Sequence, residues 1–104
     1  MTYQLTALYH HPEDVDAFDR YYDGTHVPLA STLPGLRSYT VSRPDPDADG
    51  EQAPYHLVAV LTWNSAEAFH AAVSSAEGQA TLADLANFAG AGVDMCTGTS
   101  DAVV

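Results

Sequence analysis

The sequence predicts an α+β domain with the element order strand, helix, strand, strand, helix, strand. Segments with the period-two alternation or β-branched content of strands are separated by segments whose apolar residues recur at spacings of three and four. This order fits a four-stranded antiparallel sheet with two helices on one face. The length of 104 residues suffices for one small core, so we expect a single domain over residues 1–104.

The N-terminal quarter of the chain predicts the first strand and the first helix. Residues 3–9 alternate large apolar and polar positions, as a strand with one covered face does. Pro12 suits the first position of a helix, because its missing N–H would be unpaired there anyway, and we expect a helix over residues 12–23. One face of this helix carries Val15, Phe18 and Tyr22.

The most distinctive stretch is Tyr21–Leu29 (YYDGTHVPL). The ring of Pro28 would collide with the carbonyl of Gly24 in an unbroken α-helix, so we expect the helix to kink or to restart here, with Thr25 able to cap the new turn. His26 would then lie at the start of a helical turn, where unpaired N–H groups and the positive end of the dipole disfavour imidazolium. We therefore expect a neutral, proton-accepting His26.

Two adjacent strands follow, over residues 36–43 and 55–63, and the second has apolar residues on both faces. The acidic loop 44–54 between them contains three prolines and one glycine, which predicts a long, solvated hairpin connection. Because the helices cover only one sheet face, apolar residues on both faces predict a homodimer formed through the open sheet faces.

Two helical segments and a weak strand complete the chain. Asn64 followed by Glu67 resembles a capping box at the start of the second helix, and we expect Gly78 to break that helix. A short third helical piece is predicted over residues 80–89, with Leu82, Leu85, Ala86 and Ala89 at helical spacing, and a weak last strand over residues 92–98.

Charge and cysteine content narrow the classes of partner. The chain has 14 acidic residues against three arginines and no lysine, a formal net charge of −11 that argues against binding nucleic acid or an anionic membrane. The single cysteine, Cys96, cannot form an internal disulfide, and no apolar run approaches about 20 residues. We therefore expect a cytoplasmic protein without a membrane anchor.

We expect no metal and no bound cofactor. The five histidines show neither H-x-x-x-H nor H-x-H spacing, and no cysteine pair accompanies them. A glycine loop that could hold the phosphates of a nucleotide cofactor is also missing from the sequence.

Three segments together resemble one family. Tyr21–Leu29, then Leu33–Arg37 (LPGLR) leading into Tyr39, are similar to the pattern of the EthD family within the dimeric α+β barrel superfamily. The block Ala76–Phe88 (AEGQATLADLANF) resembles that family's stretch after the second helix. The resemblance implies a ferredoxin-like βαββαβ monomer, a dimeric α+β barrel formed through the sheets, and a pocket between sheet and helices in each subunit.

The candidate site centres on His26, with Tyr22 as the second catalytic candidate. A neutral imidazole can take a proton near pH 7 from a carbonyl-activated carbon or a phenol placed against it. The alternative role for His26 is that of a helix-start residue bonded to the backbone, and for the aromatic residues it is packing. The residues expected to contact a substrate are Tyr21, Tyr39, His56, Trp63 and Arg37.

Two classes of function remain open. The first is a cofactor-independent enzyme that performs proton transfer, cyclisation or oxidation on a small aromatic or polyketide-like substrate, in catabolism or secondary metabolism. The second, which the resemblance to EthD implies, is a non-catalytic ligand-binding accessory protein of an oxidative pathway for ether or aromatic degradation. Both require a pocket around His26.

Overall fold

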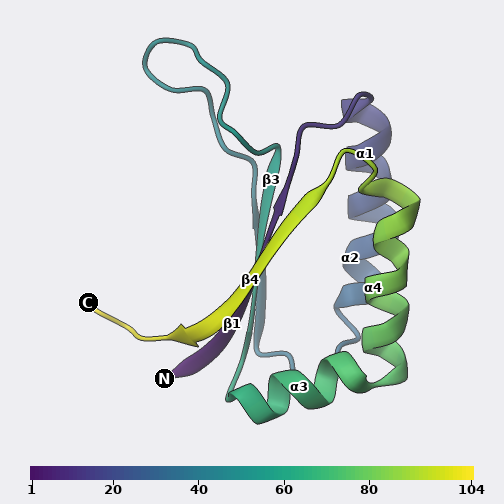
Figure 1. Ribbon diagram of the computed structural model, residues 1–104, viewed down its shortest axis with the longest axis vertical. Helices are drawn as coiled ribbons and strands as arrows, with labels where there is room; N and C mark the ends of the chain where they lie inside the picture. The colour runs from purple at the N-terminus through teal and green to yellow at the C-terminus, as the bar shows by residue number, and fades with distance from the viewer.

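Helices and sheet form two layers in the computed structural model, which describes all of residues 1–104 (Figure 1). The ferredoxin-like βαββαβ order predicted from the sequence is confirmed. None of the helices is long and apolar enough to cross a membrane. The elements are β1 (Thr2–Tyr9), α1 (Val15–Tyr21), a π-helical turn (Tyr22–His26), α2 (Val27–Ala30), β2 (Ser38–Ser42), β3 (Leu57–Trp63), α3 (Ala66–Ser74), α4 (Ala76–Phe88) and β4 (Val93–Ser100).

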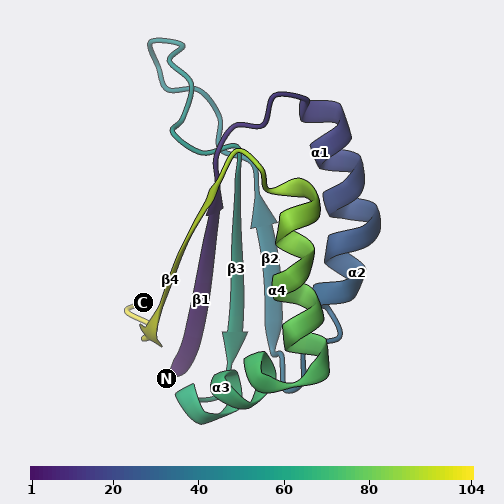
Figure 2. The same ribbon diagram turned by 45° about the vertical axis from the view of Figure 1, so that its right-hand side comes forward.

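The sheet is antiparallel throughout, with the strand order β2-β3-β1-β4. The two central strands, β1 and β3, pair Leu5 with Leu61, and the outer strands add Tyr39 and Thr97 at the same level. The acidic loop 44–54 projects beyond the end of the sheet as the connection of the β2–β3 hairpin, as predicted (Figures 1 and 2).

All helices cover the same face of the sheet, with α4 running alongside the α1–α2 segment (Figure 2). On β3, residues 57, 59, 61 and 63 point into this layer and are buried, whereas Val58, Val60 and Thr62 on the open face are half-buried. The sequence predicted apolar residues on both faces of the sheet, but the aromatic residues of the strands lie on one face only. Because register partners share a face, Tyr9, Tyr39 and Trp63 all lie on the helix side.

The first helix begins later than predicted. Asp14, not Pro12, precedes α1, and its side chain accepts a hydrogen bond from the Ala17 N–H at 3.0 Å, as an N-cap does. Pro12 and Asp14 are both residues that commonly occur at the start of a helix. The helix begins after Asp14, whose carboxylate caps it.

The helix does not break before Pro28. The chain stays helical through a π turn, in which the Val27 N–H bonds to the Tyr22 carbonyl five residues back instead of four. This wider turn accommodates a proline within a continuous helical segment, so no new cap is needed. Thr25 is accordingly exposed and caps nothing, which corrects the prediction of a restart.

The second helical region also differs from the prediction in its caps. Ser65, not Asn64, caps α3, and Ser75 both ends α3 and caps α4 by accepting from the Gly78 N–H at 3.0 Å. Gly78 therefore lies inside the first turn of α4 rather than at a break. A Cβ at this position would lie 2.2 Å from the Ala72 carbonyl oxygen, so the tight α3–α4 corner requires glycine.

Candidate functional site

A narrow apolar cavity lies between the covered sheet face and the helices. Small residues leave room for it: Ala7 and Ala59 on the central strands, and Ala30 and Gly78 on the helices. The cavity is small, with a volume of about 40 Å³. The residues at the mouth are Leu82 of α4 and Met95 of β4, each 45% exposed.

His26 reaches this cavity from the end of the π turn and is paired with a carboxylate on another helix. Its Nδ1 lies 2.9 Å from Oδ2 of Asp84 in α4. Both residues are buried, His26 at 4% and Asp84 at 7% exposure. The ring of His26 packs against those of Phe88 and Tyr22, with centroid distances of 4.6 Å and 5.3 Å.

Asp84 is held by two further donors. The Tyr21 hydroxyl donates to Oδ1 at 2.6 Å, and the Asn87 amide donates to the same oxygen at 3.0 Å. Burial acts to raise the pKa of Asp84, but the hydrogen bonds from Tyr21, Asn87 and His26 outweigh it and hold the pKa below its ordinary value. Asp84 is therefore an ionised acceptor.

The same network fixes the protonation of His26. Burial lowers the pKa of its imidazole, against the opposing effect of the Asp84 carboxylate. An ionised Asp84 can only accept, so Nδ1 carries the single proton of the neutral ring. Nε2 is then the basic nitrogen, and it has no hydrogen-bond partner in the protein. The neutral His26 expected from the sequence is thus supported, although burial and not a helix start is the cause.

Tyr22 lines the cavity beside His26 and is completely buried. Its hydroxyl is bonded to that of Tyr39 at 2.6 Å. Burial raises the pKa of Tyr22, and the neighbouring Tyr39 hydroxyl raises it further, so Tyr22 stays a neutral phenol.

The structure brings some of the predicted site residues together and separates others. His26, Tyr22 and Trp63 line the cavity, with the Trp63 indole N–H bonded to the Pro34 carbonyl at 3.0 Å. Tyr21 and Tyr39 do not line it, but each bonds to a residue of the site.

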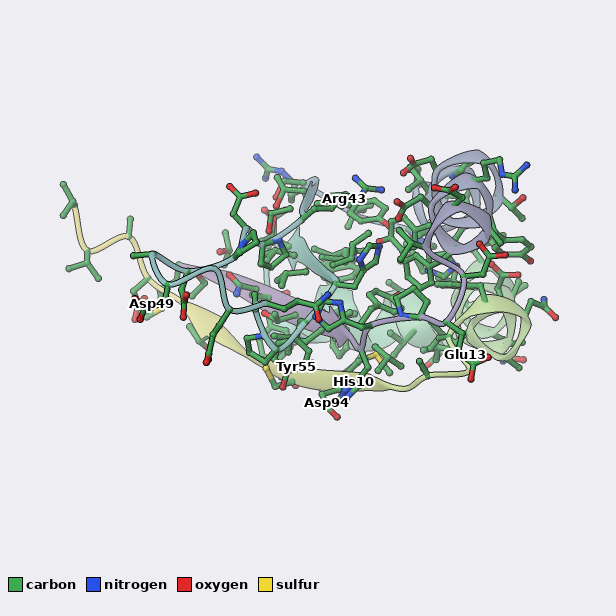
Figure 3. The ribbon with its side chains drawn as sticks, turned by 90° about the horizontal axis from the view of Figure 1, so that it is seen from above. His10, Glu13, Arg43, Asp49, Tyr55 and Asp94 are labelled. Carbon is green, nitrogen blue, oxygen red and sulfur yellow. The ribbon has the colours of Figure 1, made fainter.

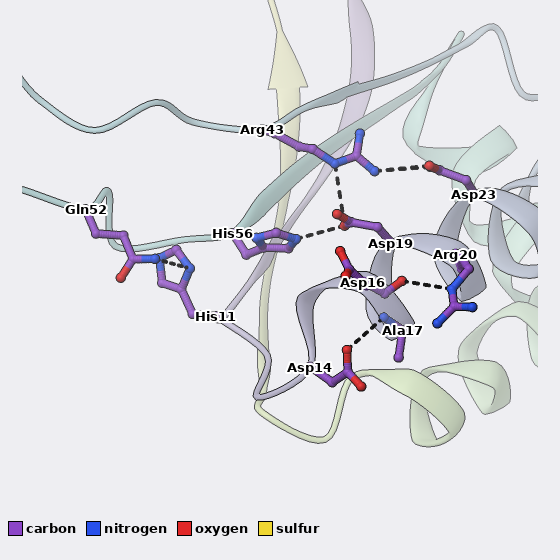
Figure 4. Close-up of polar contacts among 10 residues, drawn as sticks. All are labelled: His11, Asp14, Asp16, Ala17, Asp19, Arg20, Asp23, Arg43, Gln52 and His56. Atoms are coloured by element: carbon purple, nitrogen blue, oxygen red, sulfur yellow. Dashed lines mark hydrogen bonds and ion pairs between the residues drawn. The ribbon is translucent and has the colours of Figure 1, made fainter.

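Arg37 and His56, two predicted substrate contacts, do not line the cavity. The exposed Arg37 precedes β2, and its guanidinium donates to the Asn64 side chain at 2.5 Å. His56 precedes β3 and bonds to Asp19 at 2.9 Å (Figure 4). The sequence placed both residues within predicted strands, and this suggested that their side chains could reach the cavity. In the structure they bond instead to Asn64 and Asp19.

Asp84 is the site residue that sequence reasoning missed. The prediction took Leu82 and Leu85 as the covered side of this helix, whereas Leu82 is 45% exposed and the buried positions include Thr81 and Asp84. The available signal was the spacing of Thr81, Asp84 and Phe88, which places the carboxylate on one stripe with an aromatic residue. A buried aspartate requires donors, and Tyr21 and His26 are the donors that the sequence offered.

The arrangement contains an acid–base pair but no cluster of three or more side chains of the metal-binding types. The Asp84 carboxylate, the His26 imidazole and the apolar cavity together can accept a proton from a ligand at Nε2.

The EthD domain family model matches residues 10–92, a range that contains both His26 and Asp84. The chain belongs to the EthD family. An uncharacterized 11.0 kDa protein from the thcB–thcC intergenic region of Rhodococcus erythropolis is 38% identical to it over 93 residues, which are 89% of each chain.

Solved structures of other proteins are similar to this chain over nearly its whole length. An EthD family protein from Bacillus halodurans has a TM-score of 0.91 at 35% identity, covering 97% of this chain and 100% of that one. SnoaB from Streptomyces nogalater, a cofactor-independent oxygenase, has a TM-score of 0.66 at 16% identity, covering 99% of this chain and 95% of that one. At that identity the likeness to SnoaB shows only a shared fold.

Proposed function

We propose that this EthD family protein is a cofactor-independent enzyme in which His26 removes a proton from a small aromatic or polyketide-like substrate. One observation carries the proposal: the Asp84–His26 pair presents the unpartnered Nε2 of a neutral, buried imidazole to an apolar cavity.

The proton moves from a C–H group beside a carbonyl, or from a phenolic O–H group, to Nε2 of His26. The electron pair of the broken bond stays on the substrate as an enolate or phenolate, and the imidazole becomes imidazolium. Asp84 keeps its negative charge and stabilises that imidazolium through the 2.9 Å contact to Nδ1. A positioned base of this kind contributes about 10²- to 10⁴-fold to the rate.

The cavity wall supports a substrate with little polar surface. Its lining is predominantly hydrophobic and includes Leu5, Leu61 and Trp63. A ring-sized ligand does not fit the enclosed void, so it must displace the flexible side chains of Leu82 and Met95 at the mouth. Once formed in this water-poor space, the anion can close a ring, isomerise or react with dioxygen.

Deuterium exchange tests the proton transfer without knowledge of the natural substrate. We would incubate the protein with 1-indanone, 2-tetralone and 1-tetralone in D₂O and follow loss of the α-proton signal by NMR. The expected result is exchange above the buffer rate, lowered about 10²-fold or more by His26→Ala. The matched control is His70→Ala, which removes an exposed histidine of α3 that does not line the cavity.

Equal exchange by wild type and His26→Ala with every ketone of the panel would overturn the proposal. Saturable binding of these ketones without any exchange would favour the second class of function, an accessory protein that only holds its ligand.

We further propose that the protein acts as a homodimer formed through the open sheet faces. Leu8, Val58 and Val60 remain half-buried on that face in the monomer, and a second copy would cover them. A protein of this fold from Thermobifida fusca, with a TM-score of 0.71 at 16% identity, is a dimeric ferredoxin-like protein. Light scattering should give the dimer mass at micromolar concentration, and Val60→Glu should shift it toward the monomer. A monomeric wild type would contradict this proposal.

A further inference from the structure

Two residues of the cavity lining carry a polar atom that no short hydrogen bond engages, and the second has so far appeared only as a core residue. The first is Nε2 of His26. The second is the hydroxyl of Tyr9, which lies at the C-terminal end of β1 on the covered face and is 2% exposed.

The Tyr9 hydroxyl is less firmly engaged than that of its neighbour. The Tyr22 hydroxyl is bonded to that of Tyr39 at 2.6 Å, whereas Tyr9 has only a weaker contact, with the Tyr22 hydroxyl. Burial raises the pKa of Tyr9, the Tyr39 hydroxyl raises it further, and the contact with Tyr22 offsets only part of this rise. Because that contact lowers the pKa of Tyr9, Tyr22 is the donor in it, and the O–H of the protonated Tyr9 remains available to a ligand.

Tyr9 and His26 both pack against the ring of Tyr22. The ring centroids of Tyr9 and Tyr22 are 5.5 Å apart, and those of Tyr22 and His26 are 5.3 Å apart. The cavity thus offers one hydrogen-bond donor and one proton acceptor near a shared aromatic ring. No carboxylate, lysine or arginine belongs to its lining.

We propose that Tyr9 is a catalytic residue that donates a hydrogen bond to the carbonyl oxygen of a flat, uncharged ketone, while His26 takes the proton from the adjacent carbon. This rests on the proposed function and names its substrate class. The α C–H bond breaks and its proton goes to Nε2. Its electron pair forms the carbon–carbon double bond of the enolate, and the carbonyl π pair moves onto the oxygen that Tyr9 faces.

The chemistry explains why a donor and a base are both needed. Negative charge develops on the carbonyl oxygen as the proton leaves, and a fixed donor in a water-poor cavity stabilises it more strongly than it stabilises the neutral ketone. The loss of Tyr9 should therefore slow exchange more than it weakens binding. A carboxylate or phosphate ligand is disfavoured, because no cation in the lining would pair with it.

Infrared spectroscopy of bound 1-indanone tests the contact directly. The carbonyl stretch should lie at lower frequency in wild type than in Tyr9→Phe. Tyr9→Phe should raise the Kd for 1-indanone about 3- to 10-fold and lower the exchange rate about 10²-fold. The matched control is Tyr3→Phe, which removes a hydroxyl from the same face of the same strand, where it donates to Thr97 at 3.2 Å.

The outcomes separate this proposal from the proposed function. Exchange that depends on His26, with the same carbonyl frequency in wild type and Tyr9→Phe, overturns the role of Tyr9 alone. A Tyr9-dependent frequency without exchange supports the contact and contradicts the proton transfer. A wild-type frequency equal to that of the ketone in an apolar solvent overturns the contact without recourse to any variant, as does failure of wild type to bind 1-indanone saturably.

Discussion

Two histidine–aspartate pairs in this protein have the same contact distance but use different ring nitrogens and have different surroundings. His26 lies 2.9 Å from Asp84, and His56 lies 2.9 Å from Asp19. The side chains of the first pair are 5% and 7% exposed, and those of the second are 13% and 30% exposed. The first pair borders a cavity, whereas the second lies where α1 meets the β2–β3 hairpin (Figure 4).

The second pair shares its carboxylate with a permanent cation. Nε of Arg43 lies 3.6 Å from Asp19, and another guanidinium nitrogen lies 3.2 Å from Asp23. These contacts tie the hairpin to α1 and place a permanent positive charge beside Asp19, whereas the only basic side chain paired with Asp84 is His26. A short distance between histidine and aspartate therefore does not identify an acid–base site by itself; the first pair differs in its enclosure and in the cavity that His26 lines.

A third histidine–aspartate pair, His10 and Asp94, is more exposed than the other two. His10 and Tyr55 both bond to one oxygen of Asp94, each at 3.1 Å, where β4 begins beside the hairpin (Figure 3). His10 and Asp94 are 43% and 57% exposed, so water competes for every contact.

The largest expected difference between the first two pairs is in activity. Asp84→Asn presents an amide to Nδ1 of His26, and an amide N–H favours the tautomer in which Nε2 carries the proton and cannot act as a base. We expect ketone exchange to fall about 10²-fold or more, with Asp19→Asn within about twofold of wild type. Equal losses in the two variants, measured in the D₂O exchange assay, would show that burial does not distinguish the pairs.

The next expected difference, smaller than that in activity, is in how much each aspartate contributes to the stability of the fold. Asp84→Ala leaves buried donors of Tyr21 and His26 without an acceptor, at a cost of about 2 kcal/mol in the free energy of unfolding. Asp19→Ala removes a partly solvated carboxylate and should cost less than about 1 kcal/mol. Urea unfolding followed by circular dichroism gives both values, and a larger loss for Asp19→Ala would contradict the comparison.

The smallest effect is a pH dependence from His26. Because its pKa in the folded state lies below the ordinary value of 6.5, the unfolded chain binds more protons in the window below that value. This contribution to stability is complete above about pH 6.5 and is lost as the pH falls below it. Urea unfolding from about pH 8 to about pH 5 should show the decline, and His26→Gln should make it shallower. If the free energy of unfolding fell equally steeply with pH in His26→Gln and in wild type, His26 would not be the source of the pH dependence.

The order of the elements along the chain and the central histidine were predictable from the sequence, because both rest on local patterns. Period-two alternation located β1, the run of strand-forming residues located β3, and the unusual composition of Tyr21–Leu29 pointed to His26. The acidic hairpin loop followed from its prolines and its glycine. Each of these signals lies within a few residues of the feature that it predicts.

The rest of the site depends on contacts between residues far apart in the chain. Asp84 is 58 residues from His26, and its role follows only from the packing of α4 against the π turn. Tyr9 was predictable as a core residue of β1, but the availability of its O–H depends on how the hydroxyls of Tyr22 and Tyr39 are arranged. Arg37 and His56 failed as cavity residues for the same reason, since remote polar partners direct their side chains.

The π turn at Tyr22–His26 makes the site depend on the number of residues as well as on their identity. Each residue of an α-helix advances the side-chain direction by about 100°, and the π turn holds one residue more than a regular turn. Deletion of the exposed Gly24 would restore a regular helix and turn His26 by about that angle relative to Phe18, away from Asp84. A relative with the same histidine and aspartate but a turn shorter by one residue would thus carry both side chains without the pair. Alignments across this family therefore need to preserve the spacing through this turn before a shared histidine is taken as a shared base.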